Sequence, residues 1–546
     1  MPLSYAHGVS VKPLLGETIP GNFERTVARV PDREALVSCH EQVRFTYAEL
    51  AAAVDRLAGG LIAAGLERGD RVGIWSPNRH EWVLSQYAAA KAGAILVNVN
   101  PAYRTHELAY ALNHSGCRLL LAAPEFKSSD YAAMVAAVQP QTPRLERAIF
   151  FSSDEWGEVL AAGEQVDPGL LVKRGAELDF DDPVSIQYTS GTTGSPKGAT
   201  LTHHNILNNA NITAENLGYS DRDRVCVPVP LYHCFGCVAG TLASTSHGAC
   251  IVLPAAGFDP LATLEAIAGE RCTSLYGVPT MYIAQLEHPR FADFDLSSLR
   301  TGLMAGSPCP TEVMKNVIDR MGIAEMGIIF GMTETSPAST QVDPHDTIER
   351  RCGTVGQVMD HTEIKIVDPT SGHTLPRGAP GEFCARGYLV MRGYWEDPER
   401  TAQAIDSGRW MHTGDLATMD TSGYVKIVGR IKDMIIRGGE NVYPREVEEF
   451  LYAHPDVADV QVIGVPDERF GEELMAWIQV REGAALSERD LRAHCDGAIA
   501  HFKVPRYWHF VDEFPMTVTG KIQKYKMREV AIEQLGLQRA ADVATA

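Results

Sequence analysis

A run of glycine and hydroxyl residues near position 190 has the composition of a phosphate-binding loop. From Tyr188 to Gly198 the sequence reads YTSGTTGSPKG, and it directly follows the β-type stretch VSIQ over 184–187. Glycines let the backbone approach an anion closely, and N–H and hydroxyl groups then donate to phosphate oxygens. The run includes a lysine, and it does not fit the G-x-x-x-x-G-K-[ST] pattern of a P-loop. The predicted phosphate contacts are Thr189, Ser190, Gly191, Thr192, Thr193, Gly194 and Lys197.

A second segment, over 330–334, combines a ring, a hydroxyl and a carboxylate directly after a strand-like run. The ring suits stacking on adenine, the hydroxyl suits an α-phosphate, and the carboxylate suits Mg²⁺. Because Mg²⁺ takes one or two protein carboxylates together with phosphate oxygens and water, a single glutamate beside a phosphate loop is a suitable ligand. The predicted nucleotide-site residues are Phe330, Gly331, Met332, Thr333 and Glu334, with Glu334 as the metal ligand.

Two further side chains suit the remaining parts of a nucleotide reaction. Asp415 ends the segment WMHTGD over 410–415, and an ionised carboxylate accepts two hydrogen bonds, enough to hold both hydroxyls of a ribose. Lys521 follows a glycine near the C-terminus, in PMTVTGK over 515–521. A cation positioned in this way can stabilise negative charge that develops on a phosphate.

The order of these segments resembles that of the adenylate-forming enzymes, which include acyl-CoA synthetases, aryl-CoA ligases, firefly luciferase and the adenylation domains of peptide synthetases. The resemblance spans roughly residues 40 to 535. Phe330 stands where the family usually has tyrosine, so the stacking ring is kept and a hydroxyl is lost. The six motifs that carry the resemblance occupy 188–198, 230–236, 330–334, 410–415, 429–441 and 515–521.

The resemblance implies roles that the residue types alone do not settle. Arg430 matches a second ribose contact, Lys432 the pivot of a hinge, and Lys521 a catalytic lysine at the junction of carboxylate and α-phosphate. Gly438 and Gly439 match a segment that lines the tunnel for the pantetheine arm of CoA. Glycines suit a tunnel wall because the backbone comes close without side chains.

The resemblance also bears on the acyl site. It places His233, in PLYHCFG over 230–236, between the nucleotide and the acyl pocket, as a catalytic-site residue. It matches Gly306, Ser307 and Pro308 to the adenine pocket. We further expect small residues, namely Gly236, Ala305, Gly306 and Gly331, to leave room for an apolar chain.

Three observations restrict the acyl substrate. No acidic residue occurs from Tyr232 to Thr245, where peptide-synthetase domains hold an amino group, which argues against an α-amino acid. Cys237 stands where some long-chain enzymes have a gating tryptophan, which argues against a tunnel for very long chains. The stretch Met304–Pro310 is similar to that of medium-chain fatty acyl-CoA synthetases.

The resemblance therefore implies an ATP-dependent fatty acid–CoA ligase, with ATP, Mg²⁺ and CoA as its cofactor set. The acid forms an acyl-adenylate and releases pyrophosphate, and the CoA thiol then displaces AMP. Transfer to a carrier protein and an aryl or branched-acid CoA ligase stay open as alternatives. A non-catalytic acyl-nucleotide binder is disfavoured because the charged residues of the motifs are all present. Whether Arg437, Lys503, Arg506 and the basic run 521–528 hold the CoA phosphates is left open.

These motifs need a scaffold of alternating strands and helices, and the N-terminal sequence supplies it. Residues 46–49 have capping-box form before a helix-spaced apolar pattern that continues to Leu61. A strand is predicted at 71–75, a helix at 81–92 and a second strand at 94–97. Such alternation implies parallel sheets covered on both faces, hence an α/β fold.

The second half of the chain has a different pattern of predicted strands. Shorter, glycine-punctuated strands follow residue 350 and predict a small β-rich subdomain over about 350–430. We place the N-terminal adenylation domain at 1–430 and a small, mobile α+β C-terminal domain at 431–546, with the hinge near Lys432. About 115 residues are enough for a domain that folds alone.

The composition of the chain limits the kinds of molecule that it is expected to bind. The chain has 546 residues, a formal net charge of −20, 45% hydrophobic residues and 22% charged residues. A strong negative charge disfavours nucleic acid, and no apolar stretch reaches the length of a membrane span. The eleven scattered cysteines and the absence of a signal pattern favour a reducing, cytoplasmic location. The expected partners are the small molecules fatty acid, ATP and CoA, and the oligomeric state is open, with a homodimer as one form.

Overall fold

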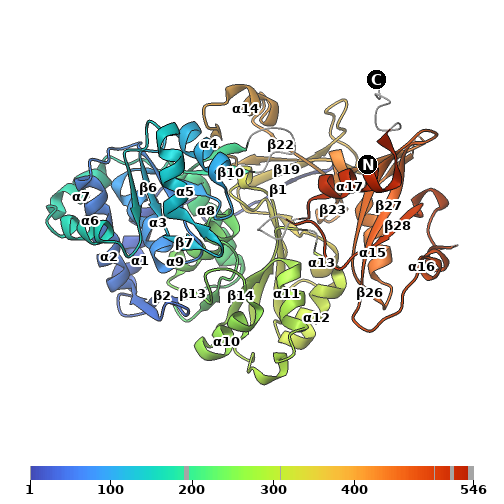
Figure 1. Ribbon diagram of the computed structural model, residues 1–546, viewed down its shortest axis with the longest axis horizontal. Coiled ribbons are helices and arrows are strands. Elements are labelled where there is room, and N and C mark those ends of the chain that lie inside the picture. Colours follow the sequence, from blue (N-terminus) through green and yellow to red (C-terminus); the bar gives the residue numbers. More distant parts are fainter. Residues whose placement is uncertain are drawn as a thin grey trace. The chain divides into compact units, whose positions relative to one another are not determined.

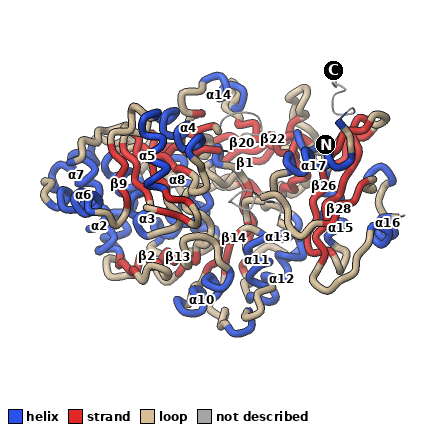
Figure 2. The backbone as a smooth tube through the Cα atoms, in the orientation of Figure 1, coloured by secondary structure: helices blue, strands red, loops and turns tan. Residues whose placement is uncertain are grey.

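The computed structural model describes residues 2–189, 196–307, 309–438, 440–496, 498–516 and 522–538. Its contacts divide the chain into two units, each described here by itself. The large unit comprises Ala6–Ile364 and Ala385–His412. The small unit comprises Met1–Tyr5, Lys365–Cys384 and Thr413–Ala546. Figure 1 colours the chain by residue number, and Figure 2 distinguishes helices from strands.

A seven-stranded sheet of the large unit carries the predicted phosphate loop. Its strands run in the order β21-β11-β10-β5-β4-β6-β9. The five strands from β10 to β9 are parallel neighbours, whereas β11 is antiparallel to β10 and β21 is antiparallel to β11. Their bounds are β4 Arg71–Trp75, β5 Ile95–Val99, β6 Leu119–Ala122, β9 Arg147–Phe150, β10 Pro183–Thr189, β11 Lys197–Thr202 and β21 Gly393–Tyr394.

A nine-stranded sheet of the same unit carries the second motif. Its order is β18-β17-β16-β15-β14-β12-β13-β2-β3, with parallel neighbours from β16 to β2 and antiparallel pairs at both ends. The bounds are β2 Glu34–Ser38, β3 Val43–Thr46, β12 Arg224–Cys226, β13 Cys250–Leu253, β14 Ser274–Gly277, β15 Thr301–Met304, β16 Glu325–Phe330, β17 Thr340–Gln341 and β18 Gln357–Val358.

Local sequence signals account for the ends of several helices in this unit. Helix α2 starts with the predicted capping box, in which Thr46 and Glu49 exchange hydrogen bonds. Helix α3 ends at Gly93, whose φ of 77° places it in the left-handed region that glycine favours. The helices are α1 Ile19–Arg29, α2 Tyr47–Ala63, α3 His80–Ala92, α4 Thr105–Ser115, α5 Tyr131–Val138, α6 Asp154–Glu164, α7 Pro168–Ala176, α8 His203–Asn216, α9 Ala243–His247, α10 Pro260–Glu270, α11 Pro279–Leu286, α12 Thr311–Met321, α13 Ile348–Gly353 and α14 Pro398–Ala404.

Short strands that follow residue 360, together with one from the N-terminus, form a five-stranded sheet. Its order is β1-β19-β20-β22-β23, with bounds β1 Tyr5–His7, β19 Thr362–Val367, β20 Gly381–Gly387, β22 Met411–Met419 and β23 Val425–Arg430. The division into units runs through this sheet, since His412 and Thr413 are successive residues of β22.

The C-terminal part of the small unit has a sheet with a hydrophobic core on each face. Its strands are β24 Ile435–Arg437, β25 Glu440–Val442, β26 Val457–Asp467, β27 Gly471–Val480 and β28 Tyr507–Phe510, in the order β25-β24-β27-β26 with β28 beside β27. Along β27, Leu474 and Ala476 pack with helices α15 Pro444–Tyr452 and α16 Glu488–Cys495. Met475 and Trp477 pack with helix α17 Lys524–Leu535. This alternation is the two-residue period of a strand covered on both sides.

The α/β fold class predicted from the sequence is confirmed, as are the strand at 71–75 and the helices starting near 46 and 81. Within the described ranges, no helix has the length and hydropathy that crossing a bilayer requires. No disulfide joins any of the eleven cysteines, all of which lie in the described ranges, and all but the half-buried Cys39 are buried. The domain boundary expected at residue 430 stays a prediction.

Candidate active site

The two strands that flank the phosphate loop hold its ends together. β10 ends at Thr189 and β11 begins at Lys197, and these two residues lie directly opposite each other in the antiparallel pair. Thr189 and Lys197 therefore form the last described pair of the two antiparallel strands of the hairpin. The predicted contacts Ser190, Gly191, Thr192, Thr193 and Gly194 lie outside the described residues, so their roles stay predictions.

The Glu334 carboxylate is buried, with 4% of the residue exposed, and it lies beside the base of this hairpin. Its Oε1 accepts a hydrogen bond from the Tyr394 hydroxyl at 2.8 Å, and Thr189 Oγ1 lies 3.5 Å from the same oxygen. The structure thus brings Thr189 of the first motif together with Glu334 of the second, as the sequence predicts.

Lys197 is placed by the same tyrosine. Its Nζ lies 4.9 Å from the centroid of the Tyr394 ring, within the range of a cation–π interaction. Burial raises the pKa of Tyr394, and the adjacent Glu334 raises it further, so the hydroxyl keeps its proton and acts as a donor. Sequence analysis did not identify Tyr394, which lies about 200 residues after the phosphate loop with no pattern to mark it.

The backbone at 331 shows why the second motif needs a glycine. A Cβ at Gly331 would lie 2.0 Å from the carbonyl oxygen of Pro337. At Gly236 of the histidine motif, a Cβ would lie 2.3 Å from the carbonyl oxygen of Pro230. The expectation that these two small residues leave room for an acyl chain is wrong, because backbone atoms occupy that space.

The histidine motif lies next to the second motif. Cys234 Sγ is 3.6 Å from Thr333 Oγ1, and both residues are buried. His233 Nδ1 accepts a hydrogen bond from the N–H of Phe235 at 3.2 Å, which orients the ring at the start of a π-helix over Phe235–Leu242. His233 is therefore one residue away from a direct neighbour of Thr333.

A group of buried polar side chains surrounds Cys237 in this π-helix. Its Sγ is 3.4 Å from Gln187 Nε2 and 3.7 Å from Asn98 Nδ2. Both amide side chains are only 3% exposed, and neither of their carbonyl oxygens has a hydrogen-bond partner among the residues that the structure describes. Burial raises the pKa of the Cys237 thiol far above its ordinary value. Gln187 and Asn98 were missed by the sequence analysis, since each is a lone amide within a strand pattern.

The other residues predicted to bind the nucleotide in the large unit lie at or just after the ends of strands. Phe330 is the last residue of β16, and Met332 donates its N–H to Thr335 Oγ1 at 3.0 Å. Gly306 and Ser307 follow β15, and Gly306 has a φ of 85°. Pro308 lies outside the described residues.

In the small unit, Asp415 and Arg430 lie opposite each other on β22 and β23. Arg430 Nε donates to Asp415 Oδ1 at 3.0 Å, and Asp415 is 7% exposed. The two predicted ribose contacts are therefore adjacent.

The predicted hinge and tunnel residues come soon after Arg430 in the sequence. Lys432 is in a 3₁₀ turn, Ile431–Asp433, that connects β23 to β24. Gly438 has a φ of 60° and donates its N–H to the carbonyl oxygen of Phe470 at 2.8 Å. Gly439 and Lys521 lie outside the described residues, and their roles stay predictions.

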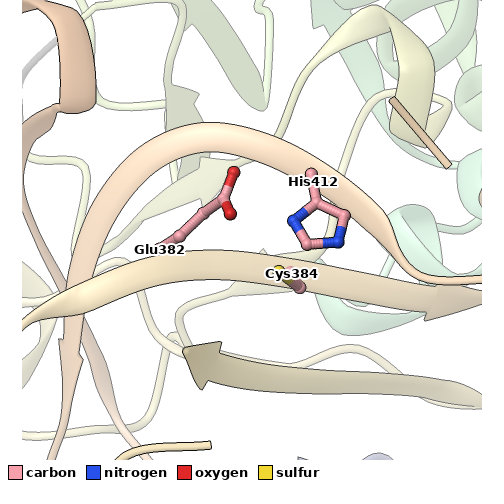
Figure 3. Close-up of side chains that lie close together, drawn as sticks. All are labelled: Glu382, Cys384 and His412. Atoms are coloured by element: carbon pink, nitrogen blue, oxygen red, sulfur yellow. The ribbon is translucent and has the colours of Figure 1, made fainter. Parts of the chain in front are cut away.

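Two other groups of side chains in the described ranges have ligand atoms within 4.8 Å of one another. Glu382 and Cys384 are on β20 and His412 is on β22 (Figure 3). The boundary between the units falls between Cys384 and His412, so this trio supports no metal assignment. Glu41, His80 and Glu81 form the second group, and Arg79 bonds to both carboxylates, which makes it an ion-pair network.

Comparisons with known proteins agree with this geometry. The AMP-binding enzyme family matches residues 23–395, and the AMP-binding enzyme C-terminal domain matches residues 446–521. The chain belongs to the AMP-binding enzyme family. The family predicted from the motifs is thereby confirmed, and with it a large N-terminal domain and a small C-terminal one.

Three similar proteins illustrate the range of the family. The medium-chain acyl-CoA ligase ACSF2, mitochondrial, of Danio rerio is 48% identical over 98% of this chain and 91% of its own length. The crystal structure of the anthranilate CoA ligase AuaEII in complex with anthranoyl-AMP has a TM-score of 0.86 at 28% identity, covering 96% of this chain and 99% of that one. ATP-bound MatB from Rhodopseudomonas palustris has a TM-score of 0.81 at 29% identity, covering 94% and 99%.

The close approach at Gly331 gives a first prediction. Gly331→Ala places a Cβ against the Pro337 carbonyl, so the turn that carries Glu334 must shift. Overpacking of this kind costs about 1–3 kcal/mol, and we expect at least a tenfold loss in the rate of pyrophosphate release from ATP and a fatty acid.

The matched control is Gly269→Ala in helix α10, where a Cβ meets nothing within 4 Å. This variant is expected to keep full activity. Equal rates for the two variants, measured on protein with native circular dichroism, would contradict the structural role assigned to Gly331.

Proposed function

We propose that this protein is an AMP-forming medium-chain acyl-CoA ligase. The assignment is supported by identities of 43–48% to proteins named medium-chain acyl-CoA ligase, over 98% of this chain. The observation that carries the chemistry is the group formed by Thr189, Lys197 and Glu334 at the base of the glycine-rich hairpin.

In the first half-reaction a carboxylate oxygen of the acid attacks the α-phosphorus of ATP, and pyrophosphate leaves. The backbone and hydroxyls of the loop donate to the phosphates, and Lys197 supplies a positive charge at the loop's end. Phe330 and the stretch from Gly306 to Pro308 are suited to the adenine, and Asp415 with Arg430 to the ribose. Lys521 is the proposed cation for the charge that develops on the α-phosphate.

Glu334 fits a Mg²⁺ site. It is a buried carboxylate next to a phosphate loop, and its Oε1 is fixed by the Tyr394 hydroxyl. One such ligand together with phosphate oxygens and water is what Mg²⁺ usually takes from a protein. When bound, the ion would neutralise charge on the triphosphate.

In the second half-reaction the CoA sulfur attacks the acyl carbonyl carbon, AMP leaves, and the thiol proton is released to solvent or a base. We propose that the C-terminal domain turns about Lys432 between the two half-reactions, and that Gly438 and Gly439 then line the path of the pantetheine arm. His233 and the segment around Cys237 are the proposed neighbours of the acyl group.

Ion pairs argue against several of the basic residues considered as contacts for the CoA phosphates. Lys503 donates to Glu446, and Arg506 to Asp467 at 3.0 Å. Lys524 donates to Glu448 at 2.6 Å and is only partly exposed. These cations are compensated by carboxylates, so they are weaker candidates for phosphate contacts than the exposed Lys526 of the same run.

Two alternatives share the first half-reaction with the proposed ligase. Transfer to a carrier protein would use the same adenylate, but free CoA would then fail to release AMP. An aryl-acid ligase is favoured by the similarity to the anthranilate CoA ligase, although that identity is much lower than to the medium-chain enzymes. Eleven cysteines without a disulfide among them are consistent with the reducing, cytoplasmic location that we propose.

The acyl substrate is tested by pyrophosphate release with straight-chain acids of graded length and with benzoate-type acids, each with and without CoA. Each added methylene contributes about 0.8 kcal/mol, roughly fourfold in kcat/KM, until the pocket is filled. We expect a maximum at medium chain length and release of AMP that depends on free CoA. A maximum with benzoate-type acids would favour the aryl ligase, and absence of CoA-dependent AMP release would favour the carrier-protein alternative.

The catalytic lysine is tested by Lys521→Ala. Loss of a positioned cation typically costs roughly 10²–10³ in rate, so adenylate formation should fall by at least that factor. Transfer of the acyl group from pre-made acyl-adenylate to CoA should be spared, because no triphosphate takes part in it. If both half-reactions fall equally, the role assigned to Lys521 is wrong.

The hinge is tested by Lys432→Pro. Proline fixes φ near −65°, which suits the 3₁₀ turn at Ile431–Asp433, so the conformation described here should persist while other conformations are restricted. We expect one half-reaction to proceed at a near-normal rate and the other to slow markedly. Lys432→Ala, which keeps φ free, is the control, and normal thioester synthesis by the proline variant would exclude a pivot at this residue.

A further inference from the structure

Tyr394 contacts both charged groups at the base of the phosphate hairpin. It is the last residue of β21, at the edge of the seven-stranded sheet, and only 8% of it is exposed. Its hydroxyl donates to Glu334 Oε1 at 2.8 Å, and its ring lies 4.9 Å from Lys197 Nζ. One side chain therefore touches a carboxylate through its oxygen and an ammonium group through its ring.

The backbone around Tyr394 is tied to the strand that begins at Lys197. Tyr394 pairs with Ala199 of β11, and the N–H of Trp395 donates to the carbonyl oxygen of Gly198 at 2.7 Å. The N–H of Tyr394 itself donates to Thr401 Oγ1 at 2.8 Å. The position of the ring is thus fixed by the same strand that carries the lysine.

The backbone of Glu334 is tied to the same short segment. Its carbonyl oxygen accepts the N–H of Met391 at 2.9 Å. Glu334 is therefore held by both backbone and side chain to residues 391–394. An ionised acceptor makes the phenol–carboxylate hydrogen bond stronger than a neutral one.

We propose that Tyr394 is a positioning residue for adenylate formation, which orients Glu334 toward Mg²⁺ through its hydroxyl and holds Lys197 through its ring. The proposal rests on the proposed function. The roles of the hydroxyl and of the ring can be tested separately. Tyr394→Phe removes the hydroxyl and keeps the ring, whereas Tyr394→Leu removes both.

A purely structural role would give a different result, and a matched control distinguishes the two. Tyr47 is also fully buried in the large unit, and its hydroxyl donates to the carbonyl oxygen of Ala249 at 2.8 Å. Tyr47→Phe therefore removes a buried tyrosine hydrogen bond of the same length, far along the chain from any candidate site residue.

The first measurement is pyrophosphate release as a function of Mg²⁺ at fixed ATP. For Tyr394→Phe we expect the Mg²⁺ concentration at half-maximal rate to rise about tenfold, the effect of losing one hydrogen bond to a charged group. The KM for the fatty acid should not change. Tyr394→Leu should add a further rise in the KM for ATP that saturating Mg²⁺ does not remove, since Lys197 loses its ring contact.

The second measurement needs no turnover. Binding of Mn²⁺ in the presence of ATP, followed by electron paramagnetic resonance without any fatty acid, should weaken in Tyr394→Phe and stay unchanged in Tyr47→Phe. Transfer from pre-made acyl-adenylate to CoA should be equal in all variants.

The possible outcomes distinguish failure of this inference from failure of the proposed function. If wild-type protein releases pyrophosphate and Tyr394→Phe has the Mg²⁺ dependence and Mn²⁺ affinity of Tyr47→Phe, the positioning role is overturned while the ligase assignment stands. If wild-type protein releases no pyrophosphate with any acid, the proposed function itself fails.

Discussion

A buried carboxylate beside the proposed phosphate loop is the constraint on which the candidate site depends. A carboxylate removed from water is costly unless hydrogen bonds replace its hydration. Glu334 follows β16 of the nine-stranded sheet, and its hydrogen-bond donor Tyr394 ends β21 of the seven-stranded sheet. One hydrogen bond between the two sheets therefore stabilises the charge and also fixes the glutamate next to the hairpin of β10 and β11.

The C-terminal part of the chain is organised in a way that suits movement as one body. Its sheet is covered on both faces, with the side chains of β27 alternating between two separate cores. All residues of both cores come from Ile435 onward, as expected for a piece that turns about a short connection. The 3₁₀ turn at Ile431–Asp433 is a connection of that kind.

Local features were predictable from the sequence, whereas contacts between distant segments were not. The capping box at Thr46 and the strand at 71–75 depend on neighbouring residues, and both were found where expected. The glycines at 236 and 331 were read as space for a substrate, although each makes room for a backbone carbonyl that only the tertiary structure reveals. Tyr394 meets Glu334 from another sheet, 60 residues along the chain, so no periodicity or motif could indicate it.

The buried thiol at Cys237 has a consequence for chemical selectivity. An acyl-adenylate is a mixed anhydride that any thiolate nearby can capture, and the thiolate rather than the thiol is the nucleophile. Burial raises the pKa of Cys237 by more than the amide donors of Gln187 and Asn98 lower it, so this thiol stays protonated next to the proposed acyl site. At the proposed acyl site, a thiol held in its protonated form does not compete with the sulfur of CoA for the acyl-adenylate.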